Sequence, residues 1–153
     1  MQTSWRCFAL IVIEGAQTKE ILCYRSSQDD IAPSLWRLPG GSKKARDVDF
    51  IQTLTTTVRS QTGIDIRRGS GIRRVHVSKQ RMPTRKKWNG GRKHLQHERF
   101  YVVTITPDRF LDEFGSFRPS NDSECEFKSV QSILGSDFFF ADHQNILRAH
   151  FNL

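Results

Sequence analysis

The chain has 153 residues, of which 37% are hydrophobic, and this length suffices for the buried core of one domain without disulfide or metal support. Its 24 Lys and Arg residues outnumber 16 Asp and Glu residues, and the resulting net charge of +8 favours an anionic partner such as a nucleotide, a nucleic acid or a membrane headgroup. Three cysteines without a C-x-x-C spacing fit reduced thiols better than a disulfide framework or a zinc site. Because no stretch approaches the about 20 apolar residues of a membrane span, we predict a single cytoplasmic domain over residues 1–153 with no membrane partner.

The first predicted elements are two strands followed by a loop. Apolar and β-branched residues run from Trp5 to Glu14, which is the pattern of a central strand covered on both faces. Glu20 to Arg25 is predicted as its partner strand. A polar loop from Ser26 to Ser34 then leads into the sequence Leu35-Trp36-Arg37-Leu38.

A sharp turn and one amphipathic helix follow. The turn is predicted at Pro39-Gly40-Gly41, because proline fixes φ and glycine reaches conformations closed to other residues. Asp47 or Asp49 is the expected N-cap of the helix, and Gly63 stands where a helix C-terminus favours a left-handed residue. The apolar stripe of this helix has helical spacing and consists of Phe50, Ile51, Leu54 and Val58.

The second half of the chain is predicted to alternate strands and short helices. We expect one long or bent strand from Ile64 to Val77, interrupted at Gly69 and Gly71, and a strong strand from His97 to Ile105. The remaining predicted elements are a short helix opened by Pro107, a strand and turn over 124–134, and a helix from Ala141 to Phe151.

The polar stretch from Ser78 to Gln96 is predicted to be an inserted arm with most of the net charge. No Asp or Glu occurs between Ile66 and His97, and the eleven cations there are Arg67, Arg68, Arg73, Arg74, Lys79, Arg81, Arg85, Lys86, Lys87, Arg92 and Lys93. Cations interleaved with an aromatic side chain can bind the backbone and a base of a nucleic acid. Three interpretations stay open: RNA or polyanion binding, positive charge supplied to a polyphosphate in the cleft, or a solvated loop. The expected ligand contacts of the arm are Arg81, Lys86, Lys87 and Trp88.

The segment from Gly41 to Ile64, here called the box segment, resembles the Nudix box of the Nudix hydrolase superfamily, G-x5-E-x7-R-E-U-x-E-E-x-G-U with U aliphatic. Gly41, Val58, Gly63 and Ile64 take the glycine and aliphatic positions when one extra loop residue is allowed. The order of the other predicted elements is also similar, over nearly the whole chain. The resemblance implies a Nudix-like α/β/α sandwich with a mixed β-sheet.

The acidic positions of the family pattern are mostly replaced. Its E-E pair falls on Ser60 and Gln61, its R-E pair falls on Thr56 and Thr57, and its loop glutamate falls on Asp47. In the family these glutamates hold divalent cations against a pyrophosphate, and Mg²⁺ requires negatively charged oxygen ligands. Asp47 is therefore the one candidate metal ligand of the box segment, and we expect Mg²⁺ as a cofactor only if the protein hydrolyses its ligand.

The resemblance also implies candidate residues around the cleft. Glu98 is the candidate for a general base or extra metal ligand outside the box segment, with a paired surface charge as the alternative. Arg25 and Arg37 flank the cleft loop, where a guanidinium suits phosphate, although both also fit ordinary structural roles. Backbone N–H groups after Gly40 and Gly41 are expected to meet phosphate oxygens.

The sequence therefore predicts a Nudix-fold protein with a degenerate box that binds a nucleotide, a nucleoside diphosphate derivative or another phosphate-rich ligand, with weak or absent hydrolysis. The first alternative is an active, divergent Nudix hydrolase that cleaves a nucleoside diphosphate linked to another group. The second is an RNA-binding or polyanion-binding module that acts through the basic arm.

Overall fold

The computed structural model describes residues 2–14, 19–43, 49–68, 72–82, 94–105 and 122–152. Its centre is a six-stranded sheet of order β4-β5-β1-β2-β6, with the short β3 also paired to β1. The strands are β1 (Gln2–Glu14), β2 (Lys19–Ser26), β3 (Gly40–Ser42), β4 (Ile72–Met82), β5 (His94–Ile105) and β6 (Ser123–Ser129). The β1–β5 pair is parallel and the other pairs are antiparallel, so the sheet is mixed as predicted.

Alternate side chains of β1 enter two different cores. Phe8, Leu10 and Val12 belong to a cluster that includes Ile146 and Leu147 of the last helix. The intervening residues of β1 belong to a second cluster on the opposite face, and they are Cys7, Ala9 and Ile11, packed with Leu54 and Val58. Both faces of the sheet are thus covered, which explains the continuous apolar run of β1.

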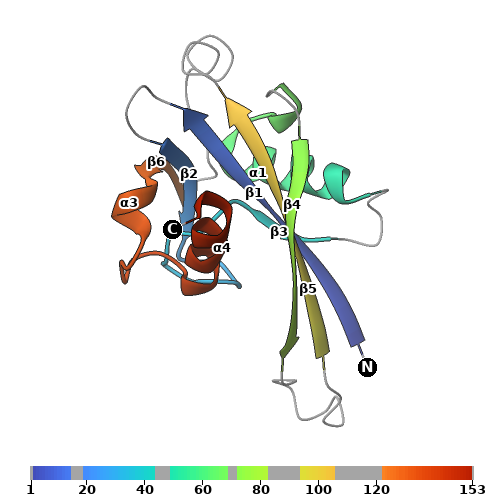
Figure 1. Ribbon diagram of the computed structural model, residues 1–153. Helices are drawn as coiled ribbons and strands as arrows, with labels where there is room; N and C mark the ends of the chain where they lie inside the picture. The colour runs from blue at the N-terminus through green and yellow to red at the C-terminus, as the bar shows by residue number, and fades with distance from the viewer. Residues whose placement is uncertain are drawn as a thin grey trace.

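Helices lie on the two sides of this sheet, with α4 (Ala141–Phe151) in front and α1 (Phe50–Thr62) behind in the view of Figure 1. We call the two sides of the sheet the α1 face and the α4 face. The short helix α3 (Val130–Ile133) and the 3-10 turn η1 (Ile66–Arg68) complete the described helical elements. The predicted α/β/α sandwich is confirmed.

The ends of α1 follow from two residues of the sequence. Of the two candidate N-caps, Asp49 takes the role, because its carboxylate accepts a hydrogen bond of 2.7 Å from the backbone N–H of Gln52. At the other end Gly63 has φ of 82°, and its N–H donates to the carbonyl of Arg59. Between these two ends, Leu54 and Val58 are fully buried against the sheet.

The region from Ile64 to Gln96 differs from the prediction. Ile66–Arg68 forms a 3-10 turn, and β4 begins only at Ile72. The expected polar arm is strand at both of its ends, because β4 continues to Met82 and β5 begins at His94, with these two residues paired. Backbone hydrogen bonds to neighbouring strands fix these ends, so they form strands without the apolar alternation on which the sequence argument depended.

The lower ends of β4, β5 and β1 project together beyond the helical layers (Figure 1). The predicted helix at Pro107 lies outside the described residues. In the part of the chain that the structure describes, no helix is long and apolar enough to cross a membrane. The three cysteines are free thiols.

Candidate functional site

The loop before β3 is fixed by a buried arginine. The Arg37 side chain is 2% exposed and makes two hydrogen bonds to the Asp29 carboxylate, from Nε to Oδ2 at 2.6 Å and from Nη2 to Oδ1 at 2.9 Å. Its Nη1 donates to the carbonyls of Leu38 at 2.7 Å and Gly40 at 3.2 Å. The ligand contact proposed for Arg37 would therefore have to displace these internal partners, and the geometry gives this side chain a positioning role.

Asp29 is the carboxylate that balances this buried charge. Burial alone would raise the pKa of Asp29, but hydrogen bonds and charge from Arg37, together with backbone N–H donors, outweigh it and hold the pKa below its ordinary value of 3.8. The carboxylate also accepts from the backbone N–H of Ala32 at 3.0 Å. Asp29 thus stays ionised at neutral pH and ties the loop at 29–32 to the segment before Gly40.

Gly40 is clamped by a side-chain amide from α1. The Gly40 N–H donates to Oε1 of Gln61 at 2.8 Å, and Nε2 of Gln61 donates back to the Gly40 carbonyl at 3.0 Å. Gly40 has φ of 142°, and a Cβ there would lie 2.1 Å from the carbonyl oxygen of Cys7. Only glycine fits this position. The Gly40 N–H is thus bonded to Gln61, whereas the N–H groups after Gly40 and Gly41 stay the predicted phosphate contacts.

The neighbouring residue, Gly41, lies close to the side chain of Thr57. A Cβ at Gly41 would lie 3.4 Å from the Thr57 methyl group. Thr57 stands at a position where the Nudix box pattern has a glutamate. Gln61 occupies another of the glutamate positions. An amide and a methyl group are poor partners for Mg²⁺, so the described residues of the box segment do not fit a magnesium site. Among the described residues, no three His, Cys, Asp or Glu side chains converge as a metal site; Asp47 lies outside them.

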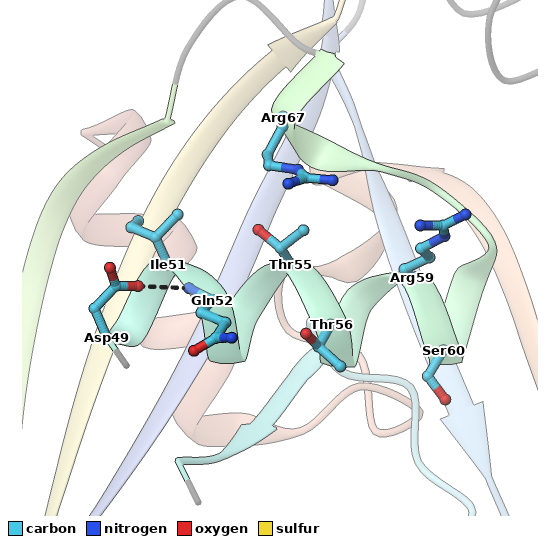
Figure 2. A pocket seen from close by; sticks show the side chains of 8 residues that line it. All are labelled: Asp49, Ile51, Gln52, Thr55, Thr56, Arg59, Ser60 and Arg67. Atoms are coloured by element: carbon cyan, nitrogen blue, oxygen red, sulfur yellow. Dashed lines mark hydrogen bonds between the residues drawn. The ribbon is translucent and has the colours of Figure 1, made fainter. Parts of the chain in front are cut away.

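The opposite side of α1 borders an open pocket of about 640 Å³. Figure 2 shows Arg59 from the last turns of α1 and Arg67 from η1 on the same side of the helix, with Thr55 below Arg67. The eight lining residues are Asp49, Ile51, Gln52, Thr55, Thr56, Arg59, Ser60 and Arg67. The pocket therefore combines two guanidinium groups with one carboxylate, from Asp49, and several hydroxyl and amide groups.

Two features describe the polar character of this pocket. Thr55 is 8% exposed, and its Oγ1 is buried without a hydrogen-bond partner. Arg67 is exposed and pairs with Asp65 at 3.2 Å; the hydrogen bond from Arg67 is the main reason that the pKa of Asp65 is lowered. The same bond raises the pKa of Arg67. Both side chains are thus charged at neutral pH.

Arg25 lies at a separate pocket, of about 340 Å³, beside β2 and β6. Its Nη2 is 2.6 Å from Oε2 of Glu124, and its guanidinium lies 4.6 Å from the centre of the Trp36 ring. Asp122 and Glu124 also line this pocket and offset the charge of the arginine. The structure therefore does not bring Arg25 together with the pocket of α1.

Glu98 and Arg81 occupy neighbouring strands. Glu98 of β5 is 4% exposed and pairs in register with Arg6 of β1 and Ser78 of β4. Strand alternation puts it on the α4 face with Phe100, whereas the box helix covers the α1 face. Arg81 lies in β4 opposite Leu95. Lys86, Lys87 and Trp88 lie outside the described residues.

Sequence reasoning missed three residues of these sites. Gln61 was treated only as a lost glutamate, although a side-chain amide can both donate to and accept from a neighbouring peptide group. Arg59 and Thr55 were assigned only to non-apolar faces of the helix. The signal that could have found them was their spacing of four residues, which places them on one side of α1.

No protein-family sequence model and no curated protein sequence matches the chain. Solved structures do match it in fold. The NUDIX domain of Shewanella oneidensis NrtR, complexed with ADP ribose, superposes with a TM-score of 0.71 at 15% identity, over 99% of this chain and 88% of that one. A C. elegans Ap4A hydrolase in a binary complex matches with a TM-score of 0.66 at 12% identity, over 97% and 96% of the two chains.

A MutT/nudix family protein from Enterococcus faecalis has a TM-score of 0.70 at 16% identity. The match includes 99% of this chain but 62% of that one, so this chain spans less than two thirds of the length of the E. faecalis protein. Likeness at such identities concerns the fold. The predicted Nudix-like fold, and with it the resemblance drawn from the box segment, is confirmed at that level.

Proposed function

We propose that this chain, which has the Nudix fold, binds a nucleotide derivative or another phosphate-rich ligand and carries out little or no hydrolysis of it. The observation that carries the proposal is the two-way hydrogen bonding between Gln61 and Gly40. The Gln61 side chain stands at a position where the family pattern has a cation-binding glutamate.

The chemistry of this position argues against metal-assisted hydrolysis. A divalent cation bridges oxygen atoms and lowers the barrier to attack of water on phosphorus by neutralising developing charge. The Gln61 amide instead supplies a neutral N–H donor that bonds the Gly40 carbonyl directly at 3.0 Å. Hydrogen bonds within the chain hold the loop, and the described positions 56, 57, 60 and 61, where the family pattern has Arg or Glu, supply no carboxylate to bind a cation.

The pocket on the other side of α1 is our candidate for the ligand. Its volume of about 640 Å³ suits a small organic ligand, and Arg59 and Arg67 supply positive charge for a diphosphate. The ADP ribose complex of the NrtR domain makes ADP-ribose a reasonable first probe for a chain of the same fold. The cations of the basic arm, with Arg81, Lys86, Lys87 and Trp88, would add a further attraction for anions. The three free thiols support a cytoplasmic location as part of this proposal.

Calorimetric titration with ADP-ribose tests binding. We expect affinity that is independent of Mg²⁺ and decreases with salt, and we expect Arg59→Gln to weaken it severalfold. Arg148→Gln is the matched control, because Arg148 lies on α4, where its side chain bonds only weakly to Asn145 at 3.5 Å. An Arg59→Gln variant that binds like the wild type would remove the pocket of α1 from the proposal.

The alternative function is an active, divergent hydrolase that uses Asp47, Glu98 and Mg²⁺. Incubation of the protein with ADP-ribose and Mg²⁺, followed by chromatographic detection of AMP, distinguishes the two. Magnesium-dependent formation of AMP that disappears in Asp47→Ala and Glu98→Ala would overturn the binding-only function.

A further inference from the structure

The pocket of α1 has charged groups of opposite sign at its two ends. Asp49 stands at the N-terminal end of α1, whereas Arg59 lies in the last turn of the helix and Arg67 lies in η1. Figure 2 shows Asp49 at one end of the row of side chains, with Arg67 above Thr55 and Arg59 further along the helix. The rise of an α-helix places Asp49 and Arg59 about 15 Å apart along the helix axis. The pocket is therefore polarised along its length.

The arginine end is suited to a phosphate group. A guanidinium presents several N–H donors in one plane, an arrangement that matches phosphate oxygens. Arg67 pairs with Asp65 at 3.2 Å, but its side chain is 62% exposed, and Asp65 is not among the residues that line the pocket. Arg59 is also exposed. Both guanidinium groups are thus open to a ligand in the pocket.

The opposite end is suited to a neutral group that donates hydrogen bonds. Asp49 is exposed, and one of its carboxylate oxygens, Oδ1, accepts the capping bond of 2.7 Å from the Gln52 N–H. The other oxygen accepts from no residue that the structure describes, and Figure 2 shows it turned away from the capping bond. An ionised carboxylate accepts hydrogen bonds and donates none, so this oxygen suits the hydroxyl groups of a sugar and repels a phosphate.

The wall between the two ends is uncharged and includes an unsatisfied hydroxyl. The lining residues there are Ile51, Gln52, Thr55 and Thr56. Thr55 is 8% exposed, and its Oγ1 is buried without a hydrogen-bond partner. Buried polar atoms are normally satisfied, so this hydroxyl is consistent with a wall that a bound polar group completes.

We propose that the pocket of α1 selects its ligand by where the negative charge of the ligand lies, and that Asp49 is the specificity-determining residue. Arg59 and Arg67 hold the phosphate of the ligand, and Asp49 accepts hydrogen bonds from the hydroxyl groups of an attached sugar. A ligand that is anionic over its whole length, such as a linear polyphosphate, is disfavoured because it places charge against Asp49. The inference rests on the proposed function, in which this pocket binds a phosphate-rich ligand.

Salt screening makes the two ends separable by experiment. At 0.15 M salt the Debye length is about 8 Å, which is shorter than the distance of about 15 Å between the two ends. The charge of Asp49 therefore acts weakly on a phosphate at the arginines and strongly on a group that touches the carboxylate. A ligand confined to the arginine end should not sense Asp49, whereas a ligand that reaches the other end should.

The test compares two ligands by calorimetric titration at about 0.15 M KCl. Inorganic pyrophosphate is a diphosphate without a sugar, and ADP-ribose is a diphosphate with ribose on both sides. Asp49→Ser removes the carboxylate but keeps an oxygen that can cap α1, because Ser and Asp are similarly good N-caps. We expect this variant to bind ADP-ribose about tenfold more weakly, through the loss of a hydrogen bond to a charged group. It should bind pyrophosphate within about twofold of the wild type.

The matched control is Asp142→Ser. Asp142 is an exposed carboxylate in the first turn of α4, so the variant removes the same charge from the N-terminal end of the other long helix, on the opposite face of the sheet. We expect it to bind both ligands within about twofold of the wild type. Arg59→Gln should instead weaken both ligands severalfold, because both place a phosphate at the arginine end.

Folding is checked by circular dichroism and thermal melts. Asp49→Asn also keeps a good N-cap, and as a second variant it should likewise weaken ADP-ribose and spare pyrophosphate. A loss that came only from a frayed helix would weaken both ligands and lower the melting temperature.

The outcomes separate this inference from the proposed function. If Arg59→Gln weakens ADP-ribose binding but Asp49→Ser leaves it unchanged, or shifts both ligands by the same factor, the pocket binds phosphate without selection by Asp49 and this inference alone is overturned. Wild-type protein that binds pyrophosphate as tightly as ADP-ribose leads to the same conclusion. If neither ligand binds the wild type, the proposed function fails and the inference fails with it.

Discussion

The two sides of helix α1 differ in how their polar groups are used. On the inner side, toward β3, the Gln61 amide is fully engaged with Gly40, and the Thr57 methyl group lies close to Gly41. On the outer side Arg59 faces an open pocket and Thr55 retains an unpartnered hydroxyl. One helix thus both stabilises a loop and borders an open polar pocket. Hydrogen bonds within the chain hold the inner side in place.

The largest expected loss of stability comes from replacing Arg37, which holds the loop that the inner side of α1 contacts. Arg37→Met leaves the Asp29 carboxylate buried without its partner, and it also removes the donors to Leu38 and Gly40. We expect the free energy of unfolding, measured by urea denaturation, to fall by about 3–5 kcal/mol.

Two variants control this measurement. Arg37→Met/Asp29→Leu should recover much of the loss, since a buried charge pair can be replaced by apolar groups at little cost. Arg148→Met should change stability by no more than about 1 kcal/mol, because Arg148 is half-buried and, like Arg59 in α1, lies in the last turn of its helix. If Arg37→Met unfolded at the urea midpoint of the wild type, the buried arginine would not support the loop.

Gln61→Glu tests whether the amide replaces a cation. The variant loses the donor to the Gly40 carbonyl and brings a carboxylate against it, which should lower the free energy of unfolding by about 1–3 kcal/mol. We expect millimolar Mg²⁺ to restore part of the thermal stability of this variant, because the cation can bridge the two oxygens.

The same titration on the wild type and on Gln61→Met should show no such effect, since neither offers a carboxylate. If Mg²⁺ stabilised all three proteins equally, the Gln61 amide would not be replacing a bound cation.

His143 of α4 gives the segment before β3 a dependence of its stability on pH. Its Nδ1 accepts a hydrogen bond of 3.1 Å from the Leu38 N–H, and burial, together with the nearby charge of Arg37, keeps its pKa well below 6.5. Between the two pKa values, His143 is protonated in the unfolded chain and neutral in the folded chain. The free energy of unfolding should therefore fall as pH decreases from about 6.5 toward the lowered pKa, by at most about 1.4 kcal/mol per pH unit. Urea midpoints measured from pH 7.5 to 5 check this, and His143→Asn should flatten the profile. A wild-type profile already flat over this range would contradict the assignment.

The smallest expected effect on stability belongs to the outer side. Arg59→Gln removes a cation near the C-terminus of α1, where it interacts favourably with the helix dipole, so the free energy of unfolding should fall by no more than about 1 kcal/mol. The same variant is expected to lose ADP-ribose affinity, so ligand binding and stability should separate there. A large loss of stability would show that Arg59 acts structurally rather than at a ligand site.

Much of the fold could be predicted from the sequence because the local signals agreed with the tertiary contacts. The apolar stripe from Phe50 to Val58, the cap at Asp49 and the stop at Gly63 all lie where the helix packs, begins and ends. The failure at Ser78 to Met82 has a physical cause. Strand formation there depends on hydrogen bonds to β5, which lies more than ten residues away in the sequence, so local polarity carried no information about it.

The candidate site was less predictable, because burial decides what a charged residue does. Arg25 and Arg37 looked alike in the sequence, yet one is partly exposed with Glu124 and the other is enclosed with Asp29. The replacement of a glutamate by Gln61 was visible, but its hydrogen bonds to a residue 21 positions earlier were not.

The bond pattern of Gln61 also matters for the edge of the sheet. The backbone N–H and the carbonyl of Gly40 are both hydrogen-bonded to the Gln61 side chain. Gly40, in the short strand β3, therefore offers neither a donor nor an acceptor to a strand from another molecule. A side chain thereby performs the protective function that many proteins assign to a bulge or a charged residue at a sheet edge. A Gln61→Met chain should therefore self-associate more readily during refolding than the wild type, even if its folded structure is the same.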